Sequence, residues 1–321
     1  MEIRYRRKHL AEVLGIPEQR LAEADDRTDP SSVNGGPDDY GPEDLSAYRE
    51  ALGLRPGRRP LRRQLFLNFK GGTGKTSLSV SYAYRLAEMG HRVLLVDLDS
   101  QGHATQHMGF EGEHCAHTLH DVLIERLPVR DAVVDTPLAE FDLLPANLGM
   151  STIELALMPL AGREYRLKKA LDEISDSYEF IVMDAPPSFG LLNLNALIAA
   201  DDLFVPVLPD FLSFHGLKLL FETLNGLEED LDHALERIFI VINQYNPTTR
   251  IAREAREALQ THYPEFLLKT IVRQCTRFAQ ASSEGLPICA FDPRSKGAED
   301  TDSLIHEVMP TPRAEQQEKS A

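Results

Sequence analysis

A glycine-rich segment at residues 70–77 holds the residue types that bind phosphate. It reads Lys70-Gly71-Gly72-Thr73-Gly74-Lys75-Thr76-Ser77. Glycines in such a turn bring backbone N–H groups close to an anion without a Cβ in the way. Lys75 can reach the β- and γ-phosphates of a nucleotide, and the Thr76 hydroxyl can bind Mg²⁺. The segment therefore predicts a site for ATP and Mg²⁺ made by Gly71, Gly72, Thr73, Gly74, Lys75, Thr76 and Ser77.

Aspartates stand at the ends of two apolar runs, 93–97 and 180–184. Ligands of open α/β sheets bind at the carboxyl ends of the strands. We therefore expect Asp97 and Asp184 to hold Mg²⁺ together with Thr76, and Asp99 to orient the attacking water. One aspartate at a strand end is more often a helix cap or a turn residue, but three in this order favour catalysis.

The glycine-rich segment departs from the usual phosphate loop, whose spacing requires a glycine where Phe69 stands. It begins instead with a second lysine, Lys70. In this it resembles the deviant Walker A box of the ParA/MinD family. Residues 97–105 resemble the second nucleotide motif of that family, with mild departures at Ser100 and His103. Residues 180–187 resemble its Walker B strand, and the whole resemblance extends over about residues 62–308.

The resemblance implies an ATPase that uses ATP and Mg²⁺ and acts as a dimerising switch. Lys70 would cross the dimer interface to the phosphates of the partner's nucleotide, in the manner of an arginine finger. Lys75 and Asp99 would act with it in catalysis, and Asn243 stands where relatives contact adenine. Hydrolysis would then require a homodimer with two ATP molecules between its subunits.

Features of the sequence distinguish the branches of this family. Reductases of related fold need bridging cysteines, but Cys115, Cys275 and Cys289 do not follow the nucleotide motifs as such ligands would. Bacterial tyrosine kinases carry a C-terminal tyrosine cluster, whereas the last tyrosine here is Tyr263. MinD-type ATPases end in a basic amphipathic helix, but residues 310–321 contain two prolines and no apolar face. The ParA/Soj partition branch remains.

In the ParA/Soj branch, ATP-bound dimers bind DNA non-specifically through basic residues, and such contacts make binding sensitive to salt. A partner of the ParB type, or another stimulating protein, triggers slow hydrolysis. We therefore expect a cytoplasmic, nucleoid-associated ATPase that positions or segregates DNA or another cargo without binding a membrane. Glutamates interleave with the arginines of residues 250–256, as on an ordinary solvated helix face. The candidates for DNA contacts are Arg250, Arg253, Lys269, Arg273 and Arg277.

Strands that alternate with helices must position these residues. Short apolar runs are separated by longer amphipathic stretches, which is typical of a doubly wound, mostly parallel α/β sheet. The predicted helices include 75–89, 165–174 and 215–227. The predicted strands are 65–69, 93–97, 141–144, 180–183, 203–207 and 238–242.

The first 54 residues predict a small helical domain. Residues 9–21 resemble the helix-turn-helix of MerR-like winged domains, which some plasmid ParA proteins use as autorepressors. The second helix is largely acidic, so a docking module for a protein partner is an equal alternative to an operator reader. A basic linker at 55–62 would join this domain to the ATPase domain at 63–309, and 310–321 would be a polar flexible tail.

Charge and hydropathy limit the partners of the chain. The net charge is −16, and residues 1–63 hold twelve basic and twelve acidic residues. The remaining residues therefore carry the whole negative charge and repel nucleic acid on average, so any DNA contact must come from a local basic patch. No run approaches the ~20 apolar residues that a membrane span needs.

Overall fold

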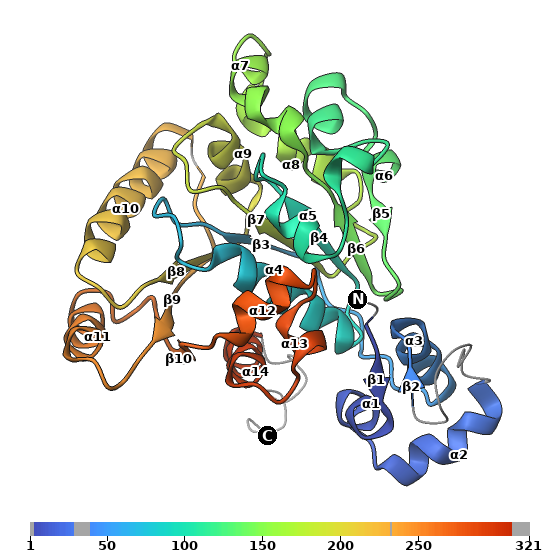
Figure 1. The fold of residues 1–321 in the computed structure, drawn as a ribbon. Helices are drawn as coiled ribbons and strands as arrows, with labels where there is room; N and C mark the ends of the chain where they lie inside the picture. The colour runs from blue at the N-terminus through green and yellow to red at the C-terminus, as the bar shows by residue number, and fades with distance from the viewer. Residues whose placement is uncertain (1–2, 29–38, 232, 310–321) are drawn as a thin grey trace, which may run out of the picture.

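Figure 1 shows the fold of the protein in a computed structural model, which describes residues 3–28, 39–231 and 233–309. The predicted tail at 310–321 lies outside the described residues, as do residues 29–38 of the predicted N-terminal domain. Within those ranges, no helix is both long enough and apolar enough to cross a bilayer.

An eight-stranded sheet forms the centre of the molecule and confirms the predicted mostly parallel α/β fold. Its strand order is β10-β9-β8-β3-β7-β4-β6-β5, and only the pairing of β5 with β6 is antiparallel. β3, which leads into the glycine-rich segment, is central between β7 and β8. The strands are β3 Arg62–Phe66, β4 Val93–Asp97, β5 Val134–Asp135, β6 Phe141–Leu144, β7 Phe180–Asp184, β8 Asp202–Val207, β9 Arg237–Tyr245 and β10 Leu267–Arg273.

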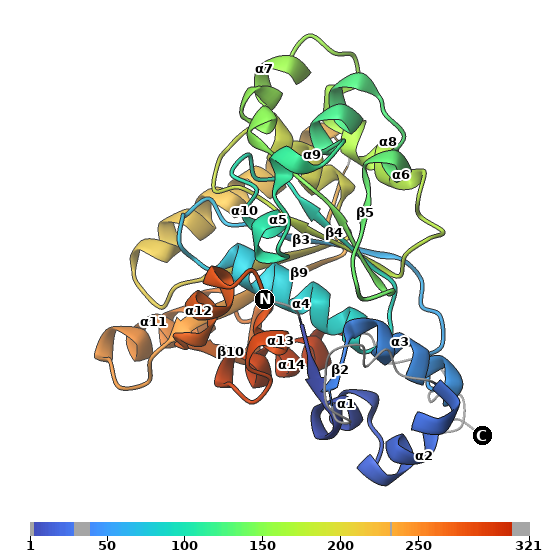
Figure 2. The same cartoon turned by 45° about the vertical axis from the view of Figure 1, so that its right-hand side comes forward.

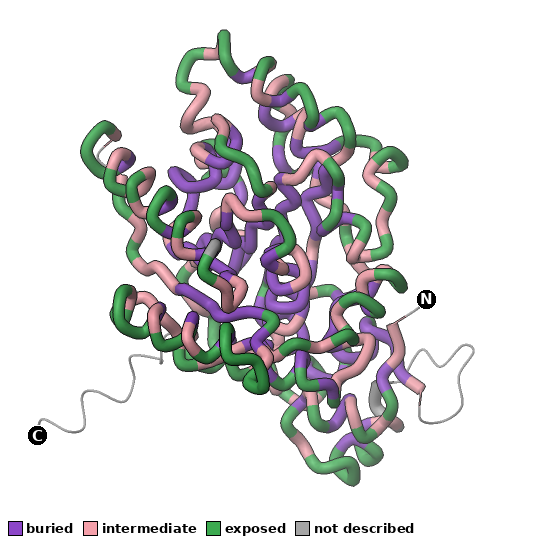
Figure 3. Tube along the Cα trace, turned by 60° about the vertical axis from the view of Figure 1, so that its left-hand side comes forward, coloured by how far each residue is buried: buried purple, intermediate pink, exposed green. Residues whose placement is uncertain are grey.

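Helices cover both faces of this sheet because successive strand residues point to opposite sides. In β4, Val93 and Leu95 belong to one apolar cluster, whereas Leu94 and Val96 belong to the other. Figure 3 shows buried segments of the chain in the interior and exposed segments toward the outside. From residue 62 on, the helices are α4 Lys75–Glu88, α5 His103–His107, α6 Val129–Ala132, α7 Ile153–Leu157, α8 Arg166–Asp172, α9 Leu191–Ala199, α10 Leu212–Leu231, α11 Arg250–His262, α12 Arg277–Ser283, α13 Ile288–Phe291 and α14 Lys296–Val308.

Short turns of other helical types join these elements. Three are 3₁₀ turns, η1 Gly112–His114, η3 Leu148–Thr152 and η4 Arg163–Tyr165, and one is the π-helical turn η2 Asp121–Glu125. The predicted helix at 165–174 is thus split between η4 and α8.

The set of predicted strands needs correction. The strand expected at 65–69 is β3 at Arg62–Phe66, because the chain turns away from the sheet at Asn68, whose side chain donates to the Pro206 carbonyl at 2.8 Å. β10 was not predicted, and Lys269 and Arg273 lie in this edge strand.

Residues 3–28 and 39–54, here called the N-terminal lobe, form a helical unit with a two-stranded antiparallel sheet. The lobe lies at the end of the molecule away from α7 (Figures 1 and 2). Its apolar side chains belong to the same buried cluster as those of α4 and α14. The elements of the lobe are β1 Tyr5–Arg6, α1 Arg7–Leu14, α2 Glu18–Thr28, β2 Asp39–Tyr40 and α3 Pro42–Ala51.

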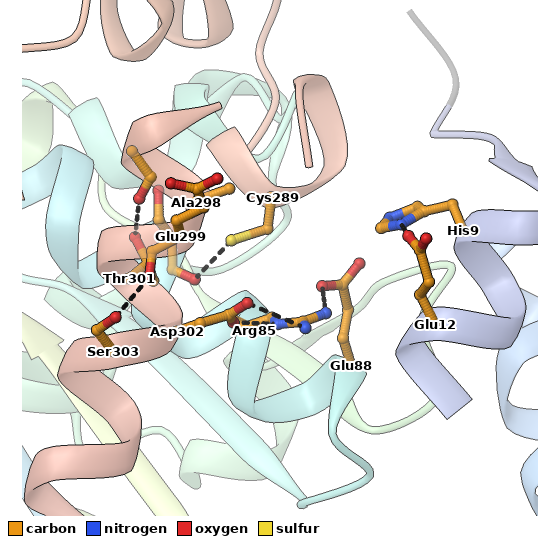
Figure 4. Close-up of polar contacts among 12 residues, drawn as sticks. His9, Glu12, Arg85, Glu88, Cys289, Ala298, Glu299, Thr301, Asp302 and Ser303 are labelled. Carbon is orange, nitrogen blue, oxygen red and sulfur yellow. Dashed lines mark hydrogen bonds and ion pairs between the residues drawn. The ribbon is translucent and has the colours of Figure 1, made fainter. Parts of the chain in front are cut away.

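A buried polar network holds the lobe against the end of α4. The Tyr5 hydroxyl donates to Glu88 at 2.8 Å, and Glu88 is fully buried. Arg85 lies between Glu88 and Asp302 of α14, at 3.0 and 2.6 Å (Figure 4). Arg49 of α3 donates to the Glu88 carbonyl, and a Cβ at Gly90 would lie 2.7 Å from its side chain. The lobe therefore docks through specific contacts as well as apolar burial.

Candidate nucleotide-binding site

The glycine-rich segment forms the turn between β3 and α4 at the carboxyl edge of the sheet. Gly72 and Gly74 have φ values of +74° and +83°, which L residues rarely adopt. Gly74 is the N-cap residue of α4, so the free N–H groups of the first helical turn point toward this loop. The segment therefore forms a cradle for an anion.

Two hydroxyls and a carboxylate meet beside this cradle. Thr76 Oγ1 donates to Asp184 Oδ2 at 2.7 Å, and Ser79 Oγ donates to Asp184 Oδ1 at 3.0 Å. Burial, together with the nearby carboxylate of Asp97, raises the pKa of Asp184 to about 7. A divalent cation would stabilise the ionised carboxylate, so Thr76 and Asp184 fit the predicted Mg²⁺ site.

Lys75 is the first residue of α4 and lies at the end of the phosphate loop, as the sequence predicts. Its Nζ donates to the Lys70 carbonyl at 3.3 Å, and burial lowers the pKa of its ammonium group. Bound phosphate would supply the negative charge that stabilises the protonated amine. Lys75 therefore fits the predicted contact with a nucleotide.

Asp97 is the hydrogen-bonding anchor of the segment that follows β4. Its carboxylate is fully buried and accepts from the Asp99 N–H at 3.0 Å and from the N–H and Oγ1 of Thr105, both at 2.8 Å. Burial raises the pKa of Asp97 to about 6. Asp97 thus fixes the turn that carries Asp99, a positioning role that the sequence did not reveal. Its role as a Mg²⁺ ligand stays a prediction, as does the role of Asp99 in orienting water.

Lys70 makes an ion pair that the sequence analysis missed. Its Nζ lies 2.7 and 3.0 Å from the two carboxylate oxygens of Asp210, which follows β8. Burial raises the pKa of Asp210, but hydrogen bonds from Lys70 and Ser213 outweigh it and the pKa is lowered. No local pattern could have revealed a contact between residues 140 positions apart.

A hollow of about 300 Å³ opens beside the loop, with a volume suited to part of a nucleoside. Gly74, Ser77, Asn243, Gln274 and Thr276 are among its lining residues. A larger hollow of about 470 Å³ lies at the junction of the lobe with the rest of the chain and borders no residue of the loop. The smaller hollow is therefore the candidate for the base.

Known proteins share this arrangement. A profile of the family described as "AAA domain" matches residues 64–237. The cell division protein PomZ of Myxococcus xanthus is 57% identical over 306 residues, which cover 95% of this chain and 93% of PomZ. The sporulation initiation inhibitor Soj of Bacillus subtilis is 35% identical over 241 residues, which cover 75% of this chain and 95% of Soj. The chain belongs to the ParA/MinD superfamily of partition ATPases.

A solved structure of related fold carries the expected ligands. Cobyrinic acid a,c-diamide synthase from Mycobacterium smegmatis, with a bound ATP analog and magnesium, is 32% identical with a TM-score of 0.62. The similarity covers 70% of this chain and 92% of that chain. As an ATPase of the ParA/MinD superfamily, the present chain uses ATP with Mg²⁺, which the cradle and the Thr76–Asp184 pair fit.

The predicted DNA contacts lie on the C-terminal part of this ParA/MinD-type ATPase, in two groups. On α11, Arg250 pairs with Glu254 at 2.6 Å, whereas Arg253 donates to the Pro247 carbonyl at 2.7 Å. Arg273 on β10 is paired with two carboxylates, those of Glu299 and Asp300 at 2.9 and 2.7 Å. Arg277 pairs with Asp292 at 2.9 Å, and Lys269 is exposed on β10. DNA contact by these residues stays a prediction.

Proposed function

We propose that this positioning ATPase is an ATP-dependent homodimeric switch. The Lys70–Asp210 pair carries the proposal, because it neutralises the loop lysine within one chain and leaves it unable to reach a second nucleotide until the pair opens. Dimerisation around ATP would exchange Asp210 for the partner's phosphates. Lys70 is then the residue that makes hydrolysis depend on two subunits.

Exposed aromatic side chains beside this pair support a self-contact. Phe189 and Phe211 are 65% and 58% exposed, and Phe189 packs on Phe69 with ring centroids 4.9 Å apart. Phe69 and Phe211 adjoin Lys70 and Asp210 in sequence. Aromatic groups of this kind are enriched at protein interfaces. The face that presents Lys70 therefore has the composition of an interface.

In this proposal the ATP-bound dimer binds DNA non-specifically and is located at the nucleoid in the cytoplasm. Arg250, Arg253, Lys269, Arg273 and Arg277 are its candidate contacts, of which Arg253 and Lys269 make no ion pair among the described residues. A partner of the ParB type, or another stimulating protein, accelerates hydrolysis and releases the dimer. The cargo in this proposal is DNA or a protein assembly.

The Asp99→Ala variant tests the switch. With ATP and Mg²⁺, the variant should accumulate as a dimer in size-exclusion chromatography with light scattering, because hydrolysis no longer separates the subunits. The matched control is Asp99→Ala with Lys70→Ala, which should remain monomeric. A strictly monomeric Asp99→Ala protein at saturating ATP would overturn the proposal.

A second candidate concerns the lobe. The proposed division has a domain at 1–54, a linker at 55–62 and an ATPase domain at 63–309. In this division the lobe would be a winged-helix-like domain that binds operator DNA, and ATP would tune how much of the operator is occupied. The turn between α1 and α2 at Gly15, with φ of +67°, favours this reading. Footprinting on the DNA upstream of the protein's own gene tests this operator-binding role. Salt-sensitive binding to random DNA, without any protected sequence, would exclude that role.

A further inference from the structure

The end of β9 holds the back of the phosphate loop through two consecutive amide side chains. Asn243 is only 4% exposed, and its Nδ2 donates to the Thr73 carbonyl at 2.7 Å. The next residue, Gln244, donates from Nε2 to the Gly72 carbonyl at 3.3 Å. Two adjacent carbonyls of the loop are therefore bound from the same strand.

The backbone on both sides is shaped for these contacts. A Cβ at Gly74 would lie 2.2 Å from Nδ2 of Asn243, so only glycine lets the loop approach this amide. Gln244 has a φ of +54° in the left-handed region, which non-glycine residues rarely adopt. In this conformation its N–H donates to Oδ1 of Asn243 at 2.8 Å and fixes the orientation of that amide.

The orientation of the loop carbonyls determines where its N–H groups point. In a trans peptide the C=O and N–H bonds point in opposite directions within one plane. Carbonyls of Gly72 and Thr73 that are held against β9 therefore direct the N–H groups of Thr73 and Gly74 toward the opposite, anion-binding side.

We propose that Asn243 and Gln244 are positioning residues that preset the phosphate cradle before the nucleotide arrives. Resemblance to relatives gives Asn243 a contact with adenine. In this structure, however, its oxygen and one of its amide hydrogens serve the backbone of Gln244 and Thr73. The inference concerns the ATP site itself and is independent of dimerisation and of DNA.

Two kinds of probe separate loop positioning from base recognition. The Asn243→Ala variant is titrated with MgATP, with magnesium tripolyphosphate and with adenosine, by displacement of a fluorescent ATP analogue. If Asn243 positions the loop, the affinities for ATP and tripolyphosphate should fall by the same factor. That factor is roughly 5-fold, because the variant loses one hydrogen bond worth about 1 kcal/mol. Adenosine affinity should not change.

Gln274→Ala is the matched control because Gln274 lines the same hollow but binds Asn246 rather than the loop. It should leave tripolyphosphate affinity unchanged. If Asn243→Ala weakens ATP and adenosine while tripolyphosphate binds as before, Asn243 reads the base and the proposal is wrong. Unchanged affinity for all three ligands would also overturn it.

Gln244→Gly provides a second variant if Asn243→Ala does not fold. Glycine adopts the left-handed φ without strain, so this change removes the amide contact with Gly72 and keeps the backbone turn. ATP and tripolyphosphate affinities should both fall by about 2-fold, consistent with the longer 3.3 Å hydrogen bond. In the MgATP complex, where bound phosphate would protect the Thr73 and Gly74 amides, their hydrogen exchange should be faster in both variants, and unaltered exchange would count against the proposal.

Discussion

Lys70 and Asp210 form an ion pair within one chain, with Nζ 2.7 Å from Oδ2, at the mouth of the phosphate loop. Asp210 also accepts from the N–H and hydroxyl of Ser213, both at 2.9 Å, at the start of α10. The carboxylate thus connects the loop lysine to a helix that is remote in sequence. Any movement of Lys70 toward a second nucleotide must first break this pair.

Asp210→Asn should increase dimerisation in the presence of ATP. Asparagine still accepts from Ser213, so α10 keeps its first hydrogen bonds, but the charge that holds Lys70 is removed. A partly exposed ion pair contributes up to about 1 kcal/mol. The dimer dissociation constant, measured by sedimentation with MgATP, should therefore fall several-fold.

Glu222→Gln is the control for this experiment, because Glu222 forms an exposed pair with Lys218 on the same helix at 3.7 Å. It should leave dimerisation unchanged. A weaker dimer in Asp210→Asn would mean that the pair prepares Lys70 for contact rather than restraining it.

Tyr5→Phe should loosen the lobe. The change removes the donor to the buried Glu88 carboxylate at 2.8 Å and the hydrogen-bond partner of the Tyr84 hydroxyl at 2.7 Å. An unsatisfied buried group costs about 1–3 kcal/mol, which chemical denaturation would detect. Tyr263→Phe is the control, since Tyr263 stacks on Phe221 and its hydroxyl makes no hydrogen bond within the described residues. Equal stability of both variants would show that apolar contacts alone hold the lobe.

Acid should destabilise the fold through His107. Burial, with a smaller effect of His103, lowers the pKa of His107 from 6.5 to about 4. The unfolded chain therefore takes up a proton at a higher pH than the folded chain. The contribution of His107 to the free energy of unfolding is fully maintained above pH ~6.5 and falls by up to about 3 kcal/mol as the pH approaches 4.

A His107→Gln variant should show a shallower decline in stability over this pH range, because glutamine does not titrate. His114→Gln, which changes an imidazole that is 78% exposed in the folded chain, should keep the steeper decline. Parallel curves for wild type and His107→Gln would assign the acid sensitivity to other groups.

Glu307→Ala should uncover the edge of the sheet. The Glu307 carboxylate accepts from the backbone N–H groups of Lys269 and Thr270, at 2.8 and 2.7 Å, along the outer side of β10. Without it, both amides should exchange faster with solvent, and the free strand edge should favour self-association at high concentration. Glu229→Ala, at an exposed position of α10, should have neither effect. Unchanged exchange at Lys269 and Thr270 would show that other contacts protect the edge.

The best-predicted elements were those with local signals. β4 has the predicted bounds because its continuous apolar run is buried on both faces of the sheet. β6 also has the predicted bounds, and its three apolar residues are buried around the partly exposed Asp142. The phosphate loop and Asp184 were also found from local patterns, and the Thr76–Asp184 contact confirms that they meet.

The missed features depend on contacts between distant parts of the chain. β10 escaped prediction because it is an edge strand, and Lys269 and Thr270 interrupt its apolar residues. Asp210 and Gln244 carry no motif, and only the folded sheet places them beside Lys70 and Gly72. The anchoring of Asp99 by Asp97 likewise depends on Thr105, which a strand-end pattern does not identify.

The central position of β3 has a consequence for the order of synthesis on the ribosome. β3 is the first strand of the large sheet to be made, but its neighbours β7 and β8 begin at residues 180 and 202. The lobe likewise cannot form all of its contacts until Glu140 has been synthesised, because the Glu140 carboxylate accepts a hydrogen bond from Ser46 of α3. More than half of the chain must therefore emerge before β3 can pair with β7 and β8, and the lobe cannot complete its contacts before residue 140 has emerged. Their apolar surfaces remain open to chaperones during that interval.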